Sequence, residues 1–283
     1  MVNWALSPRP INAARHGRHE DDAGLTALLE KIHREAGWDF TGYKKSGIAR
    51  CVGRRVVASR ASSYGEYSRV LDGDPDEWGR LFSSLTINVS EFFRDTEVFD
   101  YLRRAIPRFS GSHERFKIWS CGCAGGEEAY SMSMLLEETL TGSALKHTSI
   151  YATDIDTEAL DAGRTGEYRE DSLKNVTPEM LDKYFILASN VFYKVNHSIM
   201  SRVKFGFLDI VKGHQISHVK ILLCRNLFIY FGKALQEAVF KKLNFALRPG
   251  GLLALGRAEV VPAPYAHLYA RVDPGMSVYR KRE

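Results

Sequence analysis

The stretch Ile118-Trp-Ser-Cys-Gly-Cys-Ala-Gly-Gly-Glu-Glu128 decides the fold of this chain. Residues 116–120 are typical of a short buried strand, and a helix is predicted from residue 127 to about residue 140. The glycines at 122, 125 and 126 allow the backbone to pass close beneath a ligand, and the first turn of the helix offers unpaired N–H donors. The pattern favours a nucleotide-type ligand, and a tight turn without any ligand is the alternative.

The two acidic residues after the glycines narrow the choice of ligand. Dinucleotide-binding turns have the spacing G-x-G-x-x-G, which is not the spacing here. Glu127 and Glu128 also stand where a pyrophosphate would have to lie. Because carboxylates repel phosphate and attract cations, the turn favours the cationic methionine end of S-adenosylmethionine over a dinucleotide.

Acidic residues also follow the next two predicted strands. Asp154 closes the strand at residues 149–153, where an acidic residue normally accepts hydrogen bonds from a ribose. Its alternative role is to cap the next helix, which Asp156 would perform equally well. Asp209 follows the strand at residues 203–207 and is a candidate acceptor for an adenine amino group, or else a turn residue.

The pattern along the chain predicts two domains. Further strands at 221–224 and 251–255 alternate with helices, which indicates an α/β domain whose parallel sheet is covered on both faces. Alternating apolar residues within about 185–200 predict a small antiparallel β-subdomain. The part of the chain before this α/β domain has helical periodicity. We expect a disordered leader at 1–22, a helical domain at 23–95, a linker at 96–108 and the α/β domain at 109–283.

Composition limits the location and the partners. No apolar run approaches the ~20 residues of a membrane span, the N-terminus lacks the core of a signal peptide, and the four cysteines form no metal-binding pattern. We therefore expect a cytoplasmic protein with reduced thiols, no metal and no membrane insertion. The net charge is only +5, but residues 43–65 contain no acidic residue and six arginines and lysines. That element predicts an acidic partner, whether nucleic acid, phosphate or a carboxylate-rich protein.

Five segments resemble those of the CheR chemotaxis receptor methyltransferases, and they occur in the same order. They are Asn88-Val-Ser-Glu-Phe-Phe-Arg-Asp95, Trp119-Ser-Cys-Gly-Cys-Ala-Gly-Gly-Glu-Glu128, Ala152-Thr-Asp-Ile-Asp156, Cys224-Arg-Asn-Leu-Phe-Ile-Tyr-Phe231 and Leu247-Arg-Pro-Gly-Gly-Leu-Leu253. The first and fourth are specific to that family. The resemblance extends over about residues 25–280. It implies a Rossmann-like class I methyltransferase domain preceded by an all-helical domain, and methyl transfer from S-adenosylmethionine to receptor glutamates, with S-adenosylhomocysteine as product.

The resemblance also implies roles for individual residues. In the family the first segment bridges the two domains and contacts the cofactor, Glu127 matches the acid near the methionine end, and Asp154 matches the ribose acid. Asp209 and Ile210 replace the family's usual Asn and Leu beside the adenine, so their transfer is less secure. The implied cofactor-binding residues are Asn88, Ser90, Arg94, Gly122, Glu127, Asp154, Asp209, Ile210, Arg225 and Asn226. Tyr230 matches the tyrosine that faces the methyl group.

The chemistry that this implies needs no general base. A glutamate carboxylate has a pKa near ~4.3, so it is already ionised and nucleophilic at neutral pH. The enzyme then has to align an oxygen with the methyl carbon. Arg94 and Tyr230 are the predicted catalytic residues. The alternatives are a domain-bridging ion pair for Arg94 and a core position for Tyr230.

The basic element gains a role from the same resemblance. Arg50 and Arg54 lie one helical turn apart, opposite an apolar stripe. Together with Arg55 they are predicted to bind the Glu-rich methylation helices of receptors, although a solvated charged face is the plainer alternative. Residues 184–195 contain no glycine, unlike the loop with which some family members grip a receptor's C-terminal peptide. We therefore expect that this tether is not required.

Two other functions compete with this one. Amino-directed DNA methyltransferases need an Asn/Asp-Pro-Pro-Tyr motif, and Arg225-Asn226 stands in its place. Cys224 lacks the preceding proline of a cytosine-5 enzyme, so nucleic acid is not the expected substrate. A degraded methyltransferase fold that acts only as an interaction module is disfavoured by the retained Glu127 and Asp154.

Overall fold

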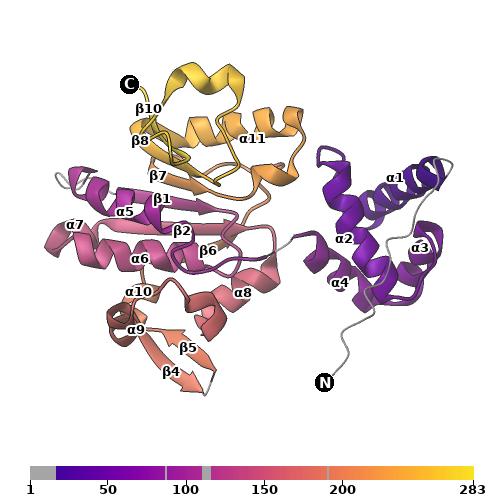
Figure 1. Ribbon diagram of the computed structural model, residues 1–283, viewed down its shortest axis with the longest axis horizontal. Coiled ribbons are helices and arrows are strands. Elements are labelled where there is room, and N and C mark those ends of the chain that lie inside the picture. The colour runs from indigo at the N-terminus through magenta and orange to yellow at the C-terminus, as the bar shows by residue number, and fades with distance from the viewer. Residues whose placement is uncertain (1–16, 87, 110–115, 190) are drawn as a thin grey trace, which may run out of the picture. The chain divides into compact units, whose positions relative to one another are not determined.

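The computed structural model describes residues 17–86, 88–109, 116–189 and 191–283 (Figure 1). The chain divides into two compact units, residues 1–85 and 86–283. The first unit contains α1 (Gly17–Ala36), α2 (Lys45–Ala58), α3 (Tyr64–Gly73) and α4 (Pro75–Leu85). Helix α2 packs on α4, and α1 packs on α3. The apolar stripes seen in the sequence form this unit's core, with Leu28, Ile32 and Val52 fully buried.

The second unit is built on a seven-stranded sheet in the order β6-β2-β1-β7-β8-β10-β9. Its strands are β1 (Phe116–Cys121), β2 (Thr148–Asp154), β6 (Val203–Phe207), β7 (Val219–Cys224), β8 (Leu247–Leu255), β9 (Tyr269–Arg271) and β10 (Val278–Lys281). The first five are parallel, whereas β10 runs antiparallel to both β8 and β9. The strand order reverses between β1 and β7, and in such sheets ligands bind at the carboxyl ends of the strands beside this reversal.

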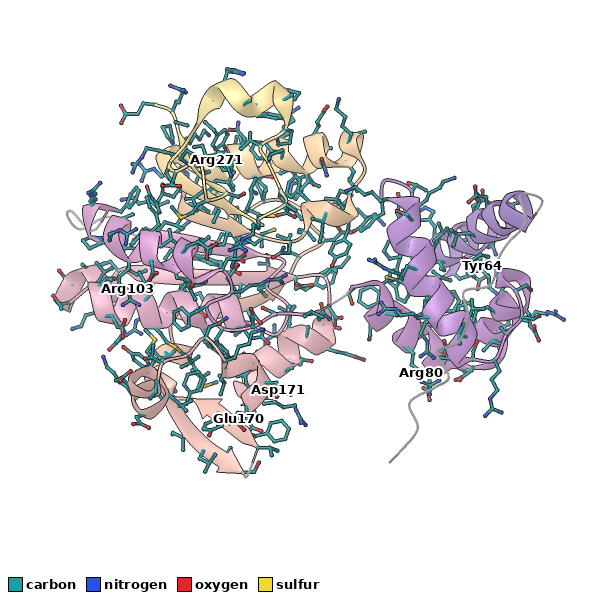
Figure 2. All side chains as sticks on the ribbon, in the orientation of Figure 1. Tyr64, Arg80, Arg103, Glu170, Asp171 and Arg271 are labelled. Carbon is teal, nitrogen blue, oxygen red and sulfur yellow. The ribbon has the colours of Figure 1, made fainter. Side chains whose placement is uncertain are left out.

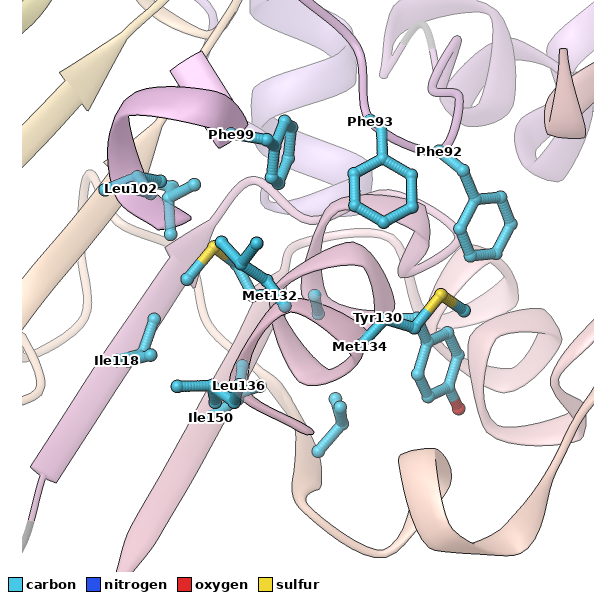
Figure 3. Packing of buried hydrophobic residues seen from close by; sticks show 14 of the residues in the cluster. Phe92, Phe93, Phe99, Leu102, Ile118, Tyr130, Met132, Met134, Leu136 and Ile150 are labelled. Carbon is cyan, nitrogen blue, oxygen red and sulfur yellow. The ribbon is translucent and has the colours of Figure 1, made fainter. Parts of the chain in front are cut away.

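Helices cover both faces of the sheet. They are α5 (Thr96–Ala105), α6 (Glu127–Thr139), α7 (Gly142–Lys146), α8 (Thr157–Thr165), α10 (His197–Met200) and α11 (Lys233–Ala246), with single 3-10 turns η1 (Ile106–Phe109), η3 (Phe228–Tyr230) and η4 (Ala263–Leu268). Helix α6 is buried almost all round, and Figure 3 shows its Met132 and Leu136 among apolar residues of α5 and the sheet. Alternate strand residues such as Leu222 belong to the opposite face, where α11 contacts β8. The predicted α/β fold is confirmed.

The domain boundaries differ from those predicted. Residues 96–108 are not a linker, because they form α5 and most of η1. Val98, Phe99 and Leu102 occupy one face of α5 and are buried in the second unit's core, and Arg103 forms an ion pair with Glu138 of α6 (Figure 2). The helical unit accordingly ends at residue 85 rather than 95. Helix α1 starts at residue 17, inside the predicted leader, and residues 1–16 lie outside the described part of the chain.

The predicted antiparallel subdomain is larger than expected. It is a three-stranded sheet in the order β3-β5-β4, with β3 (Glu167–Arg169), β4 (Phe185–Ser189) and β5 (Phe192–Val195). Between β3 and β4 the chain forms η2 (Glu170–Leu173) and α9 (Pro178–Tyr184), while residues 197–200 form α10 instead of continuing the sheet. Strand β4 is an edge strand, and its Ile186 and Leu187 are exposed.

Candidate functional site

The glycine-rich turn after β1 packs closely against neighbouring parts of the second unit, and its predicted approach to a ligand stays a prediction. Gly122 and Gly126 have φ values of 76° and 90°, which L side chains rarely adopt. A Cβ at Gly126 would lie 2.6 Å from the ring of Phe205, so no larger residue fits there. The backbone N–H groups of Gly122 and Cys123 donate to the Thr153 carbonyl, which joins this turn to the end of β2.

Asp154 lies at the end of β2, beside that turn. The carboxylate is 9% exposed and accepts hydrogen bonds from the backbone N–H groups of Ala124 (2.8 Å) and Asp156 (3.0 Å). Burial raises its pKa, and these hydrogen bonds oppose the rise. Asp156, not Asp154, caps α8 by accepting from the Ala159 N–H, so the capping alternative for Asp154 is wrong. Asp154 is therefore a buried acceptor that the helix does not require.

The two glutamates at the start of α6 have different environments. Glu128 accepts hydrogen bonds from Ser120 Oγ (2.6 Å) and Arg225 Nη1 (3.2 Å), so its charge is compensated. Glu127 is 9% exposed, and its Oε2 is buried with no hydrogen-bond partner among the described residues. Burial raises the pKa of Glu127, while hydrogen bonds from its own backbone N–H and from Ser90 oppose the rise. A buried carboxylate oxygen without a partner is costly unless a donor from a ligand reaches it.

The segment at residues 88–95 lies along this site, and its side chains contact different parts of it. Ser90 reaches Glu127, as stated above, whereas the Asn88 amide donates to the Asp156 carboxylate (2.6 Å). Arg94 is half-buried and donates from Nη1 to the Val89 carbonyl (3.2 Å). The described hydrogen bond of Arg94 is therefore within its own segment.

Arg225 connects three parts of the site. Its guanidinium is buried and donates to the Asp95 carboxylate (2.5 Å), the Arg94 carbonyl (2.7 Å) and Glu128. It also lies 5.8 Å from the Phe99 ring centroid. Through these three hydrogen bonds to partly buried acceptors, Arg225 holds the start of α5 against the end of β7 and the start of α6. Its predicted contact with the cofactor stays a prediction.

Glu259 is a residue that sequence analysis missed. It is 4% exposed, and its carboxylate accepts from the backbone N–H groups of Asn226 (2.9 Å), Ile229 (3.1 Å) and Gly256 (2.6 Å). It thereby fixes the loop after β7 that ends at the half-buried Tyr230. No local pattern could reveal this contact, because Glu259 lies far along the chain from Asn226.

The loop after β6 is also fixed from a distance. Asp209 accepts hydrogen bonds from the N–H groups of Val211 (2.8 Å) and Lys212 (3.2 Å), so it does act as a turn residue. Ile210 is buried, and its carbonyl accepts from Lys242 Nζ of α11 (3.0 Å). Lys242 donates to two further carbonyls of the same loop, which stabilises its conformation.

Four non-glycine residues around the site have left-handed backbone conformations. Each such conformation costs about 1 kcal/mol or more of conformational free energy. They are Phe93 (φ 50°), Asp95 (φ 55°), Ala124 (φ 47°) and Asn226 (φ 60°). Each is held by a contact to another segment of the second unit, and the contacting groups are Ser131, Arg225, Asp154 and Glu259, respectively. Strain that is fixed in this way is typical of a functional site.

These features fit S-adenosylmethionine better than a dinucleotide. The unpartnered Glu127 oxygen matches an ammonium group, and Asp154 is a buried acceptor at the end of β2, where an acidic residue normally binds a ribose. Residues 88–272 match the family model "CheR methyltransferase, SAM binding domain", and residues 23–86 match "CheR methyltransferase, all-alpha domain". The chain belongs to the CheR methyltransferase family. It is an S-adenosylmethionine-dependent methyltransferase.

Relatives in this CheR family resemble the chain over most of its length. The chemotaxis protein methyltransferase of Escherichia coli strain K12 is 31% identical over 266 residues, which cover 91% of this chain and 90% of that protein. Its counterpart in Salmonella typhimurium is 29% identical and covers 84% of each chain. Chemotaxis protein methyltransferase 2 of Pseudomonas aeruginosa is 28% identical and covers 89% and 91%, respectively.

The CheR all-alpha domain carries the predicted basic residues on α2. Arg50 and Arg54 are exposed, and Arg54 donates to the Ser84 carbonyl and to the Cys51 sulfur of its own unit. Arg55 instead forms two hydrogen bonds to Glu77, which is buried and also accepts from Tyr67. Burial would raise the pKa of Glu77, but these hydrogen bonds outweigh it and lower the pKa. Arg55 therefore has a structural contact with Glu77. Of the three arginines predicted to bind the receptor, Arg50 and Arg54 remain on the exposed surface.

The described ranges of the chain contain no group of three or more His, Cys, Asp or Glu side chains arranged to hold a metal ion. Within the same ranges no helix is both long and apolar enough to cross a membrane. The cysteines at 51, 121, 123 and 224 are buried free thiols.

Proposed function

We propose that this CheR methyltransferase transfers the methyl group of S-adenosylmethionine to glutamate side chains of chemoreceptors. The cofactor supplies the methyl group on a cationic sulfur. One observation carries the proposal: the Glu127 carboxylate is buried near the reversal of strand order, and its Oε2 has no hydrogen-bond partner among the described residues. A cation at that position is the ligand that offsets the cost of burying this charge.

Different residues of the second unit bind different parts of the cofactor. Glu127 accepts from the ammonium of the methionine end, with Ser90 orienting its carboxylate. Asp154 accepts from the ribose hydroxyls, and Asp209 with Ile210 borders the adenine. Gly122, in the turn after β1, borders the ligand. Asn88, Arg225 and Asn226 act indirectly, because their contacts hold the segments that carry these groups.

The methyl acceptor is a carboxylate that needs orientation rather than activation. Glutamate is ionised at neutral pH, so no proton has to be removed before the oxygen attacks the methyl carbon. Arg94 binds the incoming carboxylate through its guanidinium, and Tyr230 fixes the approach with its hydroxyl. Glu259 accepts hydrogen bonds from the backbone N–H groups of Asn226 and Ile229, and these bonds keep the Tyr230 loop in place.

Kinetics of two variants test these roles. Arg94→Ala should abolish turnover, whereas Tyr230→Phe should lower kcat about tenfold or more with the affinity for S-adenosylhomocysteine nearly unchanged, because the hydroxyl acts mainly in the transition state. Calorimetry with S-adenosylhomocysteine separates loss of binding from loss of chemistry. Unchanged kcat in Tyr230→Phe would assign that residue to packing alone.

The partner is the Glu-rich methylation helix of a cytoplasmic receptor domain, so the enzyme acts in the cytoplasm and on neither nucleic acid nor lipid. Arg50 and Arg54 on the exposed face of α2 steer this acidic helix. The exposed edge strand β4 offers a place for peptide addition, but its turn contains no glycine. A C-terminal receptor tether is therefore not required for methylation.

A further inference from the structure

A buried tyrosine of the small antiparallel sheet reaches the glycine turn of the cofactor site. Tyr168 lies in β3, is 6% exposed, and donates from its hydroxyl to the Gly125 carbonyl at 2.5 Å. A Cβ built on Gly126 would lie 3.4 Å from the same hydroxyl. The hydroxyl therefore lies directly against the peptide that precedes Glu127.

The Gly125 carbonyl is confined on a second side as well. A Cβ at Gly163 in α8 would lie 2.9 Å from this oxygen, so a glycine inside that helix permits the approach. The following N–H, that of Gly126, donates to the Cys123 carbonyl at 2.9 Å. Both ends of the 125–126 peptide are thus fixed, and with them the direction from which α6 starts.

The small sheet and the connection between its strands β3 and β4 hold the other side of the site through Phe92. The Phe92 N–H donates to the Ser172 carbonyl (3.0 Å), and Asn175 donates to the Phe92 carbonyl (3.2 Å). The Phe92 ring packs edge-on against Tyr168, with centroids 4.8 Å apart. The next residue in the chain, Phe93, is linked to the first turn of α6 by way of Ser131, which donates to the Glu127 carbonyl.

We infer that Tyr168 is a positioning residue for the methionine end of the cofactor, and that the small sheet is a structural part of that subsite. Its hydroxyl fixes the Gly125 peptide so that the Glu127 carboxylate is aimed at the ligand's ammonium group. The inference rests on the proposed placement of that ammonium at Glu127.

The test compares two ligands that differ only at the methionine end. S-adenosylhomocysteine carries the amino acid group, whereas 5′-methylthioadenosine keeps the adenosine and the thioether but lacks it. Tyr168→Phe in the full-length protein should weaken S-adenosylhomocysteine about fivefold, the effect of one buried hydrogen bond, and leave 5′-methylthioadenosine unchanged. Both affinities are measured by calorimetry, with competition for the weaker ligand.

Tyr130→Phe is the matched control. Tyr130 is also buried and donates its hydroxyl to a backbone carbonyl, that of Gly163 at 2.7 Å, so its loss removes an equivalent hydrogen bond from the same core (Figure 3). This variant should lower the melting temperature but keep the ratio of the two affinities. A general effect of core disruption would weaken both ligands alike in both variants, and that result overturns the inference.

Glu127→Gln separates the inference from the placement on which it rests. It should weaken S-adenosylhomocysteine more than Tyr168→Phe does and again leave 5′-methylthioadenosine unchanged. If only Glu127→Gln discriminates between the ligands, the role of Tyr168 is refuted and the placement stands. If Glu127→Gln does not discriminate either, the placement falls and the inference falls with it.

Discussion

Glu127→Gln should stabilise the ligand-free protein, whereas Glu128→Gln should destabilise it. Glu127 is charged, buried and without a partner for Oε2, so its ionised form costs about 1–3 kcal/mol. Glu127→Gln removes the charge and should raise the free energy of unfolding by about 1 kcal/mol or more. Glu128→Gln weakens the contact with the buried Arg225 and should lower it by about 1–3 kcal/mol.

Bound ligand should reverse the order of stability of the parent protein and Glu127→Gln. A charge-assisted hydrogen bond to the ligand's ammonium contributes about 1.5–3 kcal/mol, so Glu127→Gln should bind S-adenosylhomocysteine roughly tenfold to a hundredfold more weakly. Its melting temperature should therefore rise less on adding ligand than that of the parent protein. Differential scanning calorimetry with and without S-adenosylhomocysteine measures both effects. A ligand-free Glu127→Gln protein that melts below the parent would contradict the reasoning.

The pH dependence of this stability difference follows from the raised pKa of Glu127. Burial is the main cause of the rise above the ordinary value of 4.5. The folded state holds the proton more tightly than the unfolded state, so the parent protein loses stability as pH rises from about 4.5 through the raised pKa. The advantage of Glu127→Gln should be small below that range and full above it. An advantage that shrinks as pH rises would show that another group is responsible.

Two predictions concern the receptor. Arg50→Glu with Arg54→Glu should slow receptor methylation and flatten its salt dependence while S-adenosylhomocysteine binds normally, because these exposed charges act on the acidic partner. Arg55→Ala should instead lower the melting temperature, since it removes two hydrogen bonds from the buried Glu77 and leaves it the longer contact with Arg80 as an ion pair. Methylation rates for a receptor with and without its last few residues should be similar, and a large fall on truncation, together with binding of the isolated tail peptide, would show that a tether is used.

The sequence predicts those parts of the fold that depend on residues close together in the chain. The strand, glycine turn and helix at 116–139 follow from apolar runs and glycines, and the cap on α8 follows from Asp156. Val98, Phe99 and Leu102 have the same kind of apolar spacing and indicate α5, so the linker expected at residues 96–108 is wrong. Strand β3 has three residues, which is too short for alternation to be visible.

The parts that the sequence could not indicate depend on contacts between distant residues. Arg225 and Asp95 form an ion pair across the second unit, and Glu259 binds the loop at Asn226 from the end of another strand. Local sequence also cannot distinguish Glu127 from Glu128, because only the fold places Ser120 and Arg225 beside one of them. Burial and partners, not residue type, decide which carboxylate is available to a ligand.

The chemical nature of the methylated product tests the central claim most directly. The purified enzyme is incubated with S-adenosylmethionine labelled in its methyl group and with the cytoplasmic fragment of a candidate receptor. Glutamyl methyl esters hydrolyse in mild base, so the account predicts protein-bound label that is released as volatile methanol after alkaline treatment, and none from a fragment whose methylation-site glutamates are replaced by alanine. Label that survives base, or that appears on nucleic acid and not on the receptor fragment, would contradict it.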